Sequence, residues 1–171
     1  PGTPMARALG GEVGARTRLF DRVDLMASAF LLDLQSELVW VGDGGGTEAR
    51  GGTRRVGVEA EARVKLLSWL TADLDFTWAD AKYTDGTLVA LAPTLVVQCG
   101  VSARHPRGPY GRIGVIHLGD RPATEDGFLT AQGFTRVDAA VGFKHKRFDV
   151  AVGIQNLTNT QWREAQFANV K

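Results

Sequence analysis

Strict alternation of polar and apolar residues is the feature of this sequence that most constrains its fold. Between Arg55 and Leu66 every second residue is polar or glycine and every other one is apolar, and Leu70 to Trp78 repeats the pattern. Successive side chains of a strand point to opposite faces of a sheet, whereas a helix would scatter these carboxylates around its circumference. Both segments are therefore predicted to be β-strands with one polar and one apolar face.

The same period of two recurs along the rest of the chain, although Ile113 to Leu118 alternates poorly. Counting these runs predicts about eight strands. They lie at Glu12 to Leu19, Leu32 to Trp40, Arg55 to Leu66, Leu70 to Trp78, Thr94 to Arg104, Gly111 to Leu118, Arg136 to Lys144 and Phe148 to Gln155.

The links between these strands alternate in length. Short links are expected at Phe20 to Asp24, Leu67 to Trp69, His105 to Tyr110 and Lys144 to Arg147, and long polar ones at Gly42 to Thr53, Tyr83 to Pro93 and Gly119 to Gly133. Tight turns on one side and long loops on the other, with strands of about 9 to 11 residues and aromatic residues at both ends, are typical of outer-membrane barrels. The sequence therefore predicts an all-β fold of antiparallel up-and-down strands that form part of a transmembrane β-barrel.

In such a barrel the polar face of each strand is expected to face the lumen. A sharper interpretation of the carboxylates on this face is a pair for acid–base chemistry. Opposite charges on neighbouring strands of a polar wall explain the same pattern more simply, at about 0.2 to 1 kcal/mol per pair, so no catalytic residue is predicted. The polar residues predicted to face the lumen are Arg55, Glu59, Glu61, Arg63, Asp73 and Asp75.

Composition excludes several classes of function. The 20 basic and 19 acidic residues are spread along the chain, so no basic block is present to attract nucleic acid. The single cysteine, Cys99, leaves no zinc motif, and the three histidines are far apart. The Gly-rich run Asp43 to Thr47 lacks the Gly-Lys-Ser/Thr ending of a phosphate-binding loop. We therefore expect no metal site and no cofactor.

Four segments resemble a known family. They are Gly51 to Glu59, Trp69 to Ala81, Leu91 to Thr94, and Ile154 to Glu164 with its Asn-Leu-Thr-Asn stretch. Their order and spacing within correctly phased strands are similar to the late barrel strands of TonB-dependent outer-membrane receptors. The resemblance implies a 22-stranded barrel with an N-terminal plug, located in the outer membrane of a Gram-negative bacterium.

What the resemblance implies about function is transport without enzymatic activity. A receptor of this kind takes up a scarce solute such as a metal–siderophore complex, and its partners are the outer-membrane lipid, its own plug domain and TonB. Residues 1–171 are then expected to be a partial barrel without the plug and without the closing C-terminal strands, and Asn156 to Lys171 begins a further loop or strand. The resemblance does not indicate which solute is carried.

Two other classes remain as alternatives. One is a self-contained eight-stranded barrel that serves as a binding or structural module, and the other is a small-barrel enzyme. If the chain belongs to a receptor, the family places the solute among the long loops Asp43 to Thr53 and Gly119 to Gly133. The candidate ligand-binding residues there are Glu48, Arg50, Arg54, Asp120, Arg121, Glu125 and Asp126.

Overall fold

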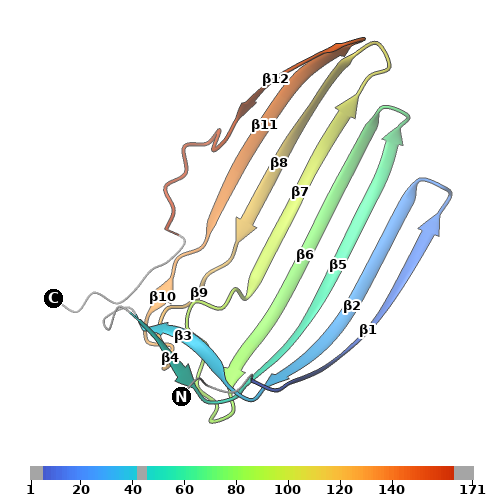
Figure 1. Cartoon of the computed structure of the whole chain (residues 1–171). Coiled ribbons are helices and arrows are strands. Elements are labelled where there is room, and N and C mark those ends of the chain that lie inside the picture. Colours follow the sequence, from blue (N-terminus) through green and yellow to red (C-terminus); the bar gives the residue numbers. More distant parts are fainter. Residues whose placement is uncertain (1–5, 42–45, 164–171) are drawn as a thin grey trace.

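The computed structural model describes residues 6–41 and 46–163, and these residues form an all-β structure. Within these ranges no helix is long and apolar enough to cross a membrane. The predicted fold class is confirmed: eight long strands form one antiparallel sheet in which each strand pairs with the one that precedes it in that sheet (Figure 1). The strands are β1 (Ala8–Leu19), β2 (Val23–Leu34), β5 (Thr53–Leu67), β6 (Leu70–Tyr83), β7 (Leu95–Arg104), β8 (Pro109–Leu118), β11 (Phe134–His145) and β12 (Phe148–Ile154).

All the short connections lie at one end of the sheet and all the long ones at the other, as Figure 1 shows. We call these the short-turn end and the long-loop end. Two small hairpins belong to the long-loop end: β3 (Glu37–Val41) with β4 (Gly46–Arg50), and β9 (Arg121–Pro122) with β10 (Thr130–Ala131). The predicted rhythm of short and long links is therefore confirmed.

One predicted strand differs in extent from the structure. The alternation suggests a single strand from Leu32 to Trp40, but β2 leaves the sheet after Leu34, and Glu37 begins the separate hairpin β3–β4. A bend at Gln35 separates the two strands, so Asp33 lies on the convex face while Glu37 contacts Thr53 and Arg55 on the concave one. A period of two therefore cannot show where one strand ends and the next begins.

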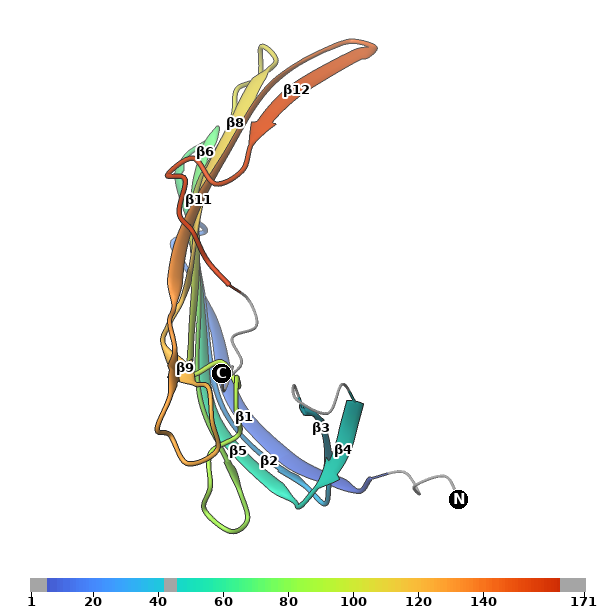
Figure 2. The ribbon, with the colours of Figure 1, turned by 90° about the vertical axis from the view of Figure 1, so that its left-hand side faces the viewer.

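The sheet is strongly curved, and its two faces differ in chemistry. Figure 2 shows the β3–β4 hairpin on the concave side, and because Glu37 of this hairpin bonds Thr53 and Arg55, the face that carries Arg55 is the concave one. Along most of β5 and β6 the register puts polar residues on this face and apolar ones on the convex face, whereas β2 places Met26, Phe30 and Leu32 on the concave face. Exposed apolar residues of the convex face include Val13, Leu25, Leu31, Val58, Leu74, Val101, Ile113, Val141 and Val152.

Buried side chains are concentrated at the long-loop end. Tyr83, Val89, Ala131, Thr53 and Arg121 are at most 6% exposed, and all lie where the long connections meet the sheet. The middle of the sheet has almost no side chain under cover among the described residues. A single sheet cannot bury its own apolar face, so its two faces must contact something else. This agrees with lipid on one face and protein or water on the other.

Candidate functional site

All six residues predicted to face a lumen lie on the concave face. Glu59, Glu61 and Arg63 follow one another at every second position of β5, and the register puts Glu61 opposite Asp75 and Arg63 opposite Asp73 on β6. Arg55 lies on the same face nearer the long-loop end. The structure thus brings the six together on one wall, while their contact with a lumen stays a prediction.

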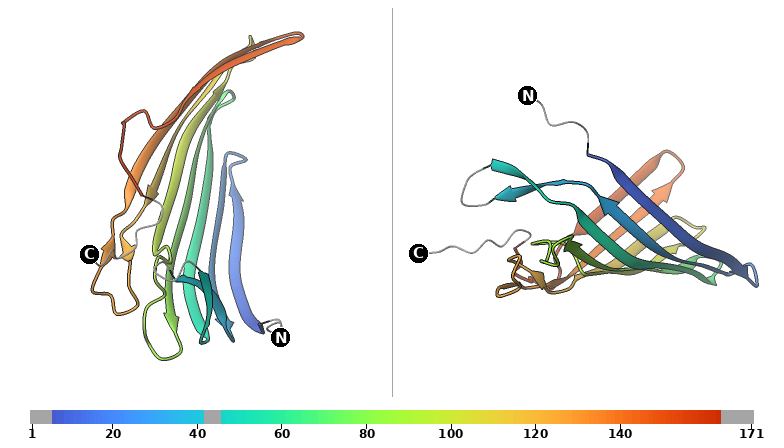
Figure 3. Two further views of the ribbon diagram at one scale, coloured as in Figure 1. Left: turned by 60° about the vertical axis from the view of Figure 1, so that its left-hand side comes forward. Right: turned by 90° about the horizontal axis from the view of Figure 1, so that it is seen from below.

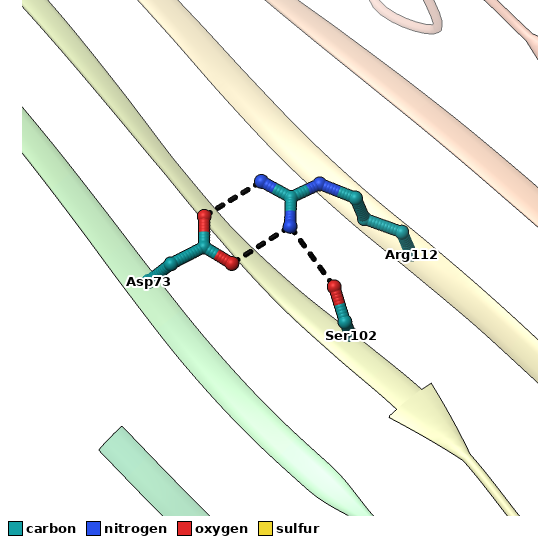
Figure 4. A network of polar contacts seen from close by, with 3 residues as sticks. All are labelled: Asp73, Ser102 and Arg112. Atoms are coloured by element: carbon teal, nitrogen blue, oxygen red, sulfur yellow. Dashed lines mark hydrogen bonds and ion pairs between the residues drawn. The ribbon is translucent and has the colours of Figure 1, made fainter. Parts of the chain in front are cut away.

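An ion pair that crosses an entire strand is the most ordered polar group of this wall. The Arg112 guanidinium on β8 donates to both carboxylate oxygens of Asp73 on β6, at 2.7 and 2.6 Å, and to the hydroxyl of Ser102 on β7 at 2.9 Å (Figure 4). Gly100 of β7 makes the crossing possible, because a Cβ atom there would lie 2.6 Å from Nη2 of Arg112. A bidentate ion pair of this kind fixes the orientation of both side chains in addition to pairing their charges.

The same arrangement recurs nearer the short-turn end. Tyr110 on β8 reaches across β11 and donates its hydroxyl to Asp149 of β12 at 2.6 Å. Gly142 of β11 leaves the room for it, since a Cβ atom at this position would lie 2.3 Å from the tyrosine ring. Glycine on the intervening strand therefore lets a long side chain tie together two strands that are not neighbours.

Two hollows among the described residues of the concave wall illustrate its chemistry. The larger, of about 330 Å³, is lined by Gln98, Arg112 and Asp138, and Gly114 and Gly153 leave it open. The smaller, of about 120 Å³, lies among arginines and carboxylates that include Glu61 and Asp75. Both offer mixed charges rather than one sign, so the wall suits polar contacts with a solute or with another protein segment better than the attraction of one kind of ion.

The hairpin β3–β4 is held to the sheet by Glu37. Its carboxylate accepts hydrogen bonds from the Thr53 hydroxyl, at 3.0 Å, and from the Arg55 guanidinium, both on β5. Thr53 is fully buried, and Arg55 is about one-third exposed. The base of the hairpin is therefore anchored on the concave side by a charged contact.

The three long connections also contact one another. Arg50 of β4 forms an ion pair with Glu125 at 2.8 Å, and the Leu88 amide donates to the Glu125 carbonyl at 2.9 Å. The Leu91 amide donates to the Pro122 carbonyl at 2.7 Å. Glu125 thus joins the β3–β4 hairpin, the β6–β7 connection and the β8–β11 connection into one loop cluster.

Among the seven residues predicted to bind a ligand, the structure brings two into direct contact. Arg50 and Glu125 pair with each other, while Asp120 accepts the Gly133 amide at 2.7 Å and closes the base of its loop. Arg121 is buried in β9. Arg54 differs most from expectation, because it lies within β5 on the convex face, where it pairs with Asp33 at 2.7 Å.

Of the other two, Asp126 shapes its own turn by accepting the Thr124 hydroxyl and the Phe128 amide. The backbone of Glu48 belongs to β4, but its side chain lies outside the described residues, as do residues 42–45 of the glycine-rich run. A ligand-binding role for any of the seven stays a prediction.

Two carboxylates of the loops have lowered pKa values. The Thr124 hydroxyl and the Phe128 amide hold the pKa of Asp126 below its ordinary value of 3.8. The Thr87 hydroxyl and amide do the same to the pKa of Asp85 in the β6–β7 connection. In both turns the hydrogen bonds favour the charged carboxylate.

Acid is therefore expected to loosen these turns. A carboxylate whose folded pKa is lowered stabilises the fold fully above its unfolded pKa, and this contribution is lost as the pH falls through the folded value. Protection of the Phe128 amide against hydrogen exchange should be constant from neutral pH to about pH 5 and fall below about pH 3.8. Asp126→Asn should remove this pH dependence, and an unchanged profile in that variant would contradict the assignment.

The Asn-Leu-Thr-Asn stretch forms a turn that returns to the concave face of β11. Asn156 has φ 55°, exchanges two hydrogen bonds with Thr160, and donates its amide to Asp138 at 2.8 Å. Trp162 then stacks on Phe134 with ring centroids 5.5 Å apart. Asparagine tolerates the left-handed conformation better than other non-glycine residues, which gives the motif a structural role.

No group of three or more histidine, cysteine or carboxylate side chains that could hold a metal occurs among residues 6–41 and 46–163. His105 and His145 lie at the short-turn end, and His117 on β8 contacts the Thr135 hydroxyl on the convex face. The three histidines are thus not gathered at one place.

Sequence reasoning missed Glu37, Arg112 and Tyr83. The alternation predicts Glu37 as part of one continuous strand, and Arg112 directly precedes Ile113 to Leu118, which alternates poorly. Tyr83 ends β6 and is only 6% exposed. The alternation places a residue on a face but does not indicate which residue two strands away it will reach.

Comparison with known proteins identifies what this sheet is similar to. The family described as TonB dependent receptor-like, beta-barrel matches residues 7–157. A search of curated proteins finds no match.

Several solved structures share the fold. The ferric yersiniabactin uptake receptor FyuA from Yersinia pestis has a TM-score of 0.78 at 19% identity, over 96% of this chain and 27% of that one. The copper transporter OprC has a TM-score of 0.77 at 16% identity, over 92% of this chain and 26% of that one. The ferric citrate transporter FecA has a TM-score of 0.76 at 18% identity, over 95% of this chain and 28% of that one. The chain therefore spans about a quarter of the length of each.

Proposed function

We propose that this chain, which belongs to the TonB dependent receptor-like β-barrel family, forms part of the wall of an outer-membrane receptor that imports a scarce solute. The family consists of transporters rather than enzymes, in agreement with the expectation of transport without enzymatic activity. The observation that carries the proposal is the division of the sheet: an apolar convex face, a polar concave face, and every long connection at one end.

The domain organisation is part of the same proposal. Residues 1–171 are a partial barrel, and the plug and the closing strands belong to other parts of the protein. The convex face contacts lipid of the outer membrane of a Gram-negative bacterium, the concave wall faces the plug, and TonB supplies energy from the inner membrane. The curvature of the sheet towards one side supports a place in the wall of a barrel (Figures 2 and 3).

The alternative of a self-contained eight-stranded barrel is not supported. Among the described residues the sheet is open, with β1 at one edge and β12 at the other, as the views in Figure 3 show. A closed barrel would pair these two strands. Further strands are needed to close the wall.

For the solute we propose a metal chelate, bound at the long-loop end on the concave side. The names of the similar structures, two of which refer to ferric chelates and one to copper, support this class. The loop cluster joined by Arg50 and Glu125 supports the location, because it places charged groups at the mouth of the polar wall.

The test is uptake by cells that depend on the full-length receptor containing this chain. Radiolabelled iron and copper are supplied as a panel of chelates, with a receptor deletion and a TonB deletion as controls. We expect at least one metal chelate to enter only when both proteins are present. Uptake that continues without TonB, or the absence of receptor-dependent uptake of any chelate, would contradict the proposal.

A further inference from the structure

A row of charged residues crosses the convex face at the long-loop end. Arg54 is directly opposite Asp33 of β2 and Lys82 of β6, and all three share the convex face because they are in register. Asp80 lies two residues from Lys82 on the same face. Arg7, whose carbonyl accepts the Gln35 amide where β1 and β2 end, lines a hollow together with Leu9 and Asp33. We call Arg7, Asp33, Arg54, Asp80 and Lys82 the outer charged row.

Two cations of this row, Arg54 and Lys82, each form an ion pair but keep unused hydrogen-bond donors. Asp33 accepts hydrogen bonds from Nε and Nη2 of Arg54 at 2.7 and 3.2 Å, and Asp80 accepts one from Lys82 at 2.8 Å. A guanidinium has five N–H donors and an ammonium three, so both cations keep donors for a further anion. The Arg54 side chain is 64% exposed and that of Lys82 49%.

The row lies where the apolar part of the convex face ends. Towards the short-turn end the next positions on this face are Leu31 and Val56, followed by Val58 opposite Trp78. Trp78 is 40% exposed on the same face. Tryptophan prefers the depth of the lipid headgroups, which places the neighbouring charged row at headgroup level.

We propose that the outer charged row binds the phosphate groups of lipids in the outer leaflet of the membrane. Arg54 and Lys82 are adjacent on neighbouring strands and together present two phosphate donors, while Asp33 and Asp80 hold them in position. The row has three cations and two anions, so its net charge also favours an anion. This inference rests on the orientation in the proposed function, in which the long-loop end meets the outer leaflet.

The test uses the full-length receptor containing this chain, purified in detergent and titrated with diphosphorylated lipid A or its dephosphorylated form, with native mass spectrometry as the readout. We expect the phosphorylated lipid to bind more tightly. The double variant Arg54→Gln with Lys82→Gln should bind the phosphorylated lipid about 30-fold more weakly. Each cation near an anionic lipid raises the affinity roughly fivefold, and the variant removes two cations.

Two further variants sharpen the test. Asp33→Asn with Asp80→Asn frees both cations and should tighten binding of the phosphorylated lipid, whereas a purely structural role of the ion pairs predicts no gain. Lys146→Gln with Arg147→Gln removes two exposed cations from the β11–β12 turn at the opposite end and should leave binding unchanged.

Equal affinity for the two lipids, or an equal loss in the Lys146 and Arg147 variant, would overturn the proposal. Inorganic phosphate that bound as tightly as the lipid would show a free-anion site and overturn the lipid assignment. Lipid binding is measured without transport. The binding result can therefore be interpreted even if the uptake experiment contradicts the proposed function.

Discussion

Gly100→Ala is expected to destabilise the receptor by about 2 kcal/mol, because the new methyl group occupies the space through which Arg112 reaches Asp73. The Asp73 side chain is only 14% exposed, so it would lose its charged partner without regaining full hydration. Gly114→Ala is the matched control. It lies opposite Gly100 on the next strand and faces the same side, yet its Cβ atom would meet nothing closer than 3.7 Å.

Arg112→Ala should cost a similar amount, since it removes the same ion pair from the other end. If both substitutions act through one contact, the double variant costs no more than either single one, so the effects are strongly non-additive. The measurement is urea unfolding of the full-length receptor, monitored by tryptophan fluorescence. Additive costs, or a Gly114→Ala variant as unstable as Gly100→Ala, would contradict the role assigned to Gly100.

Glu125→Arg is expected to lower uptake through the receptor about tenfold, because it sets two guanidinium groups against each other where Arg50 now pairs with Glu125 at 2.8 Å. Glu125→Gln should have a much smaller effect, since a partly exposed ion pair contributes less than about 1 kcal/mol. The readout is the initial rate of uptake of a chelate that the receptor imports, at equal receptor abundance.

The charge-swapped variant, Arg50→Glu with Glu125→Arg, separates two roles of these residues. If the pair serves to hold the loop cluster together, the swap restores most of the uptake that Glu125→Arg loses. If the swapped receptor stays as impaired as Glu125→Arg, then Glu125 contacts the solute itself, which is the role predicted for it from the sequence.

The rules of strand geometry explain why so much of the fold is readable from the sequence. Alternation along β5 and β6 determines that Glu59 and Asp75 share one face and that Val58 and Trp78 share the other. The lengths of the links determine which ends of the strands lie together. The same rules show that Arg54 and Arg55, being consecutive in a strand, must face opposite ways. The prediction of Arg54 as a ligand-binding residue of a loop does not take this into account.

What the candidate site contains was harder to predict, because its contacts join residues far apart in the chain. Arg112 and Asp73 are separated by 39 positions, and Thr53 and Glu37 by 16. No local pattern encodes that Gly100 will stand between the first pair. Only the pairing of three strands puts Asp73 opposite Gly100 and Arg112 opposite Ser102, so that the arginine passes Gly100 diagonally to reach the carboxylate.

The sequence by itself therefore determined most of the strands, the chemistry of the two faces of β5 and β6 over most of their length, and the end at which the long loops gather, because period two and turn length are local properties. The tertiary structure alone decided where β2 leaves the sheet, which loops meet at Glu125, and that Arg54 belongs to a charged row on the convex face. These are matters of register and curvature, and they depend on neighbours that the alternation does not identify.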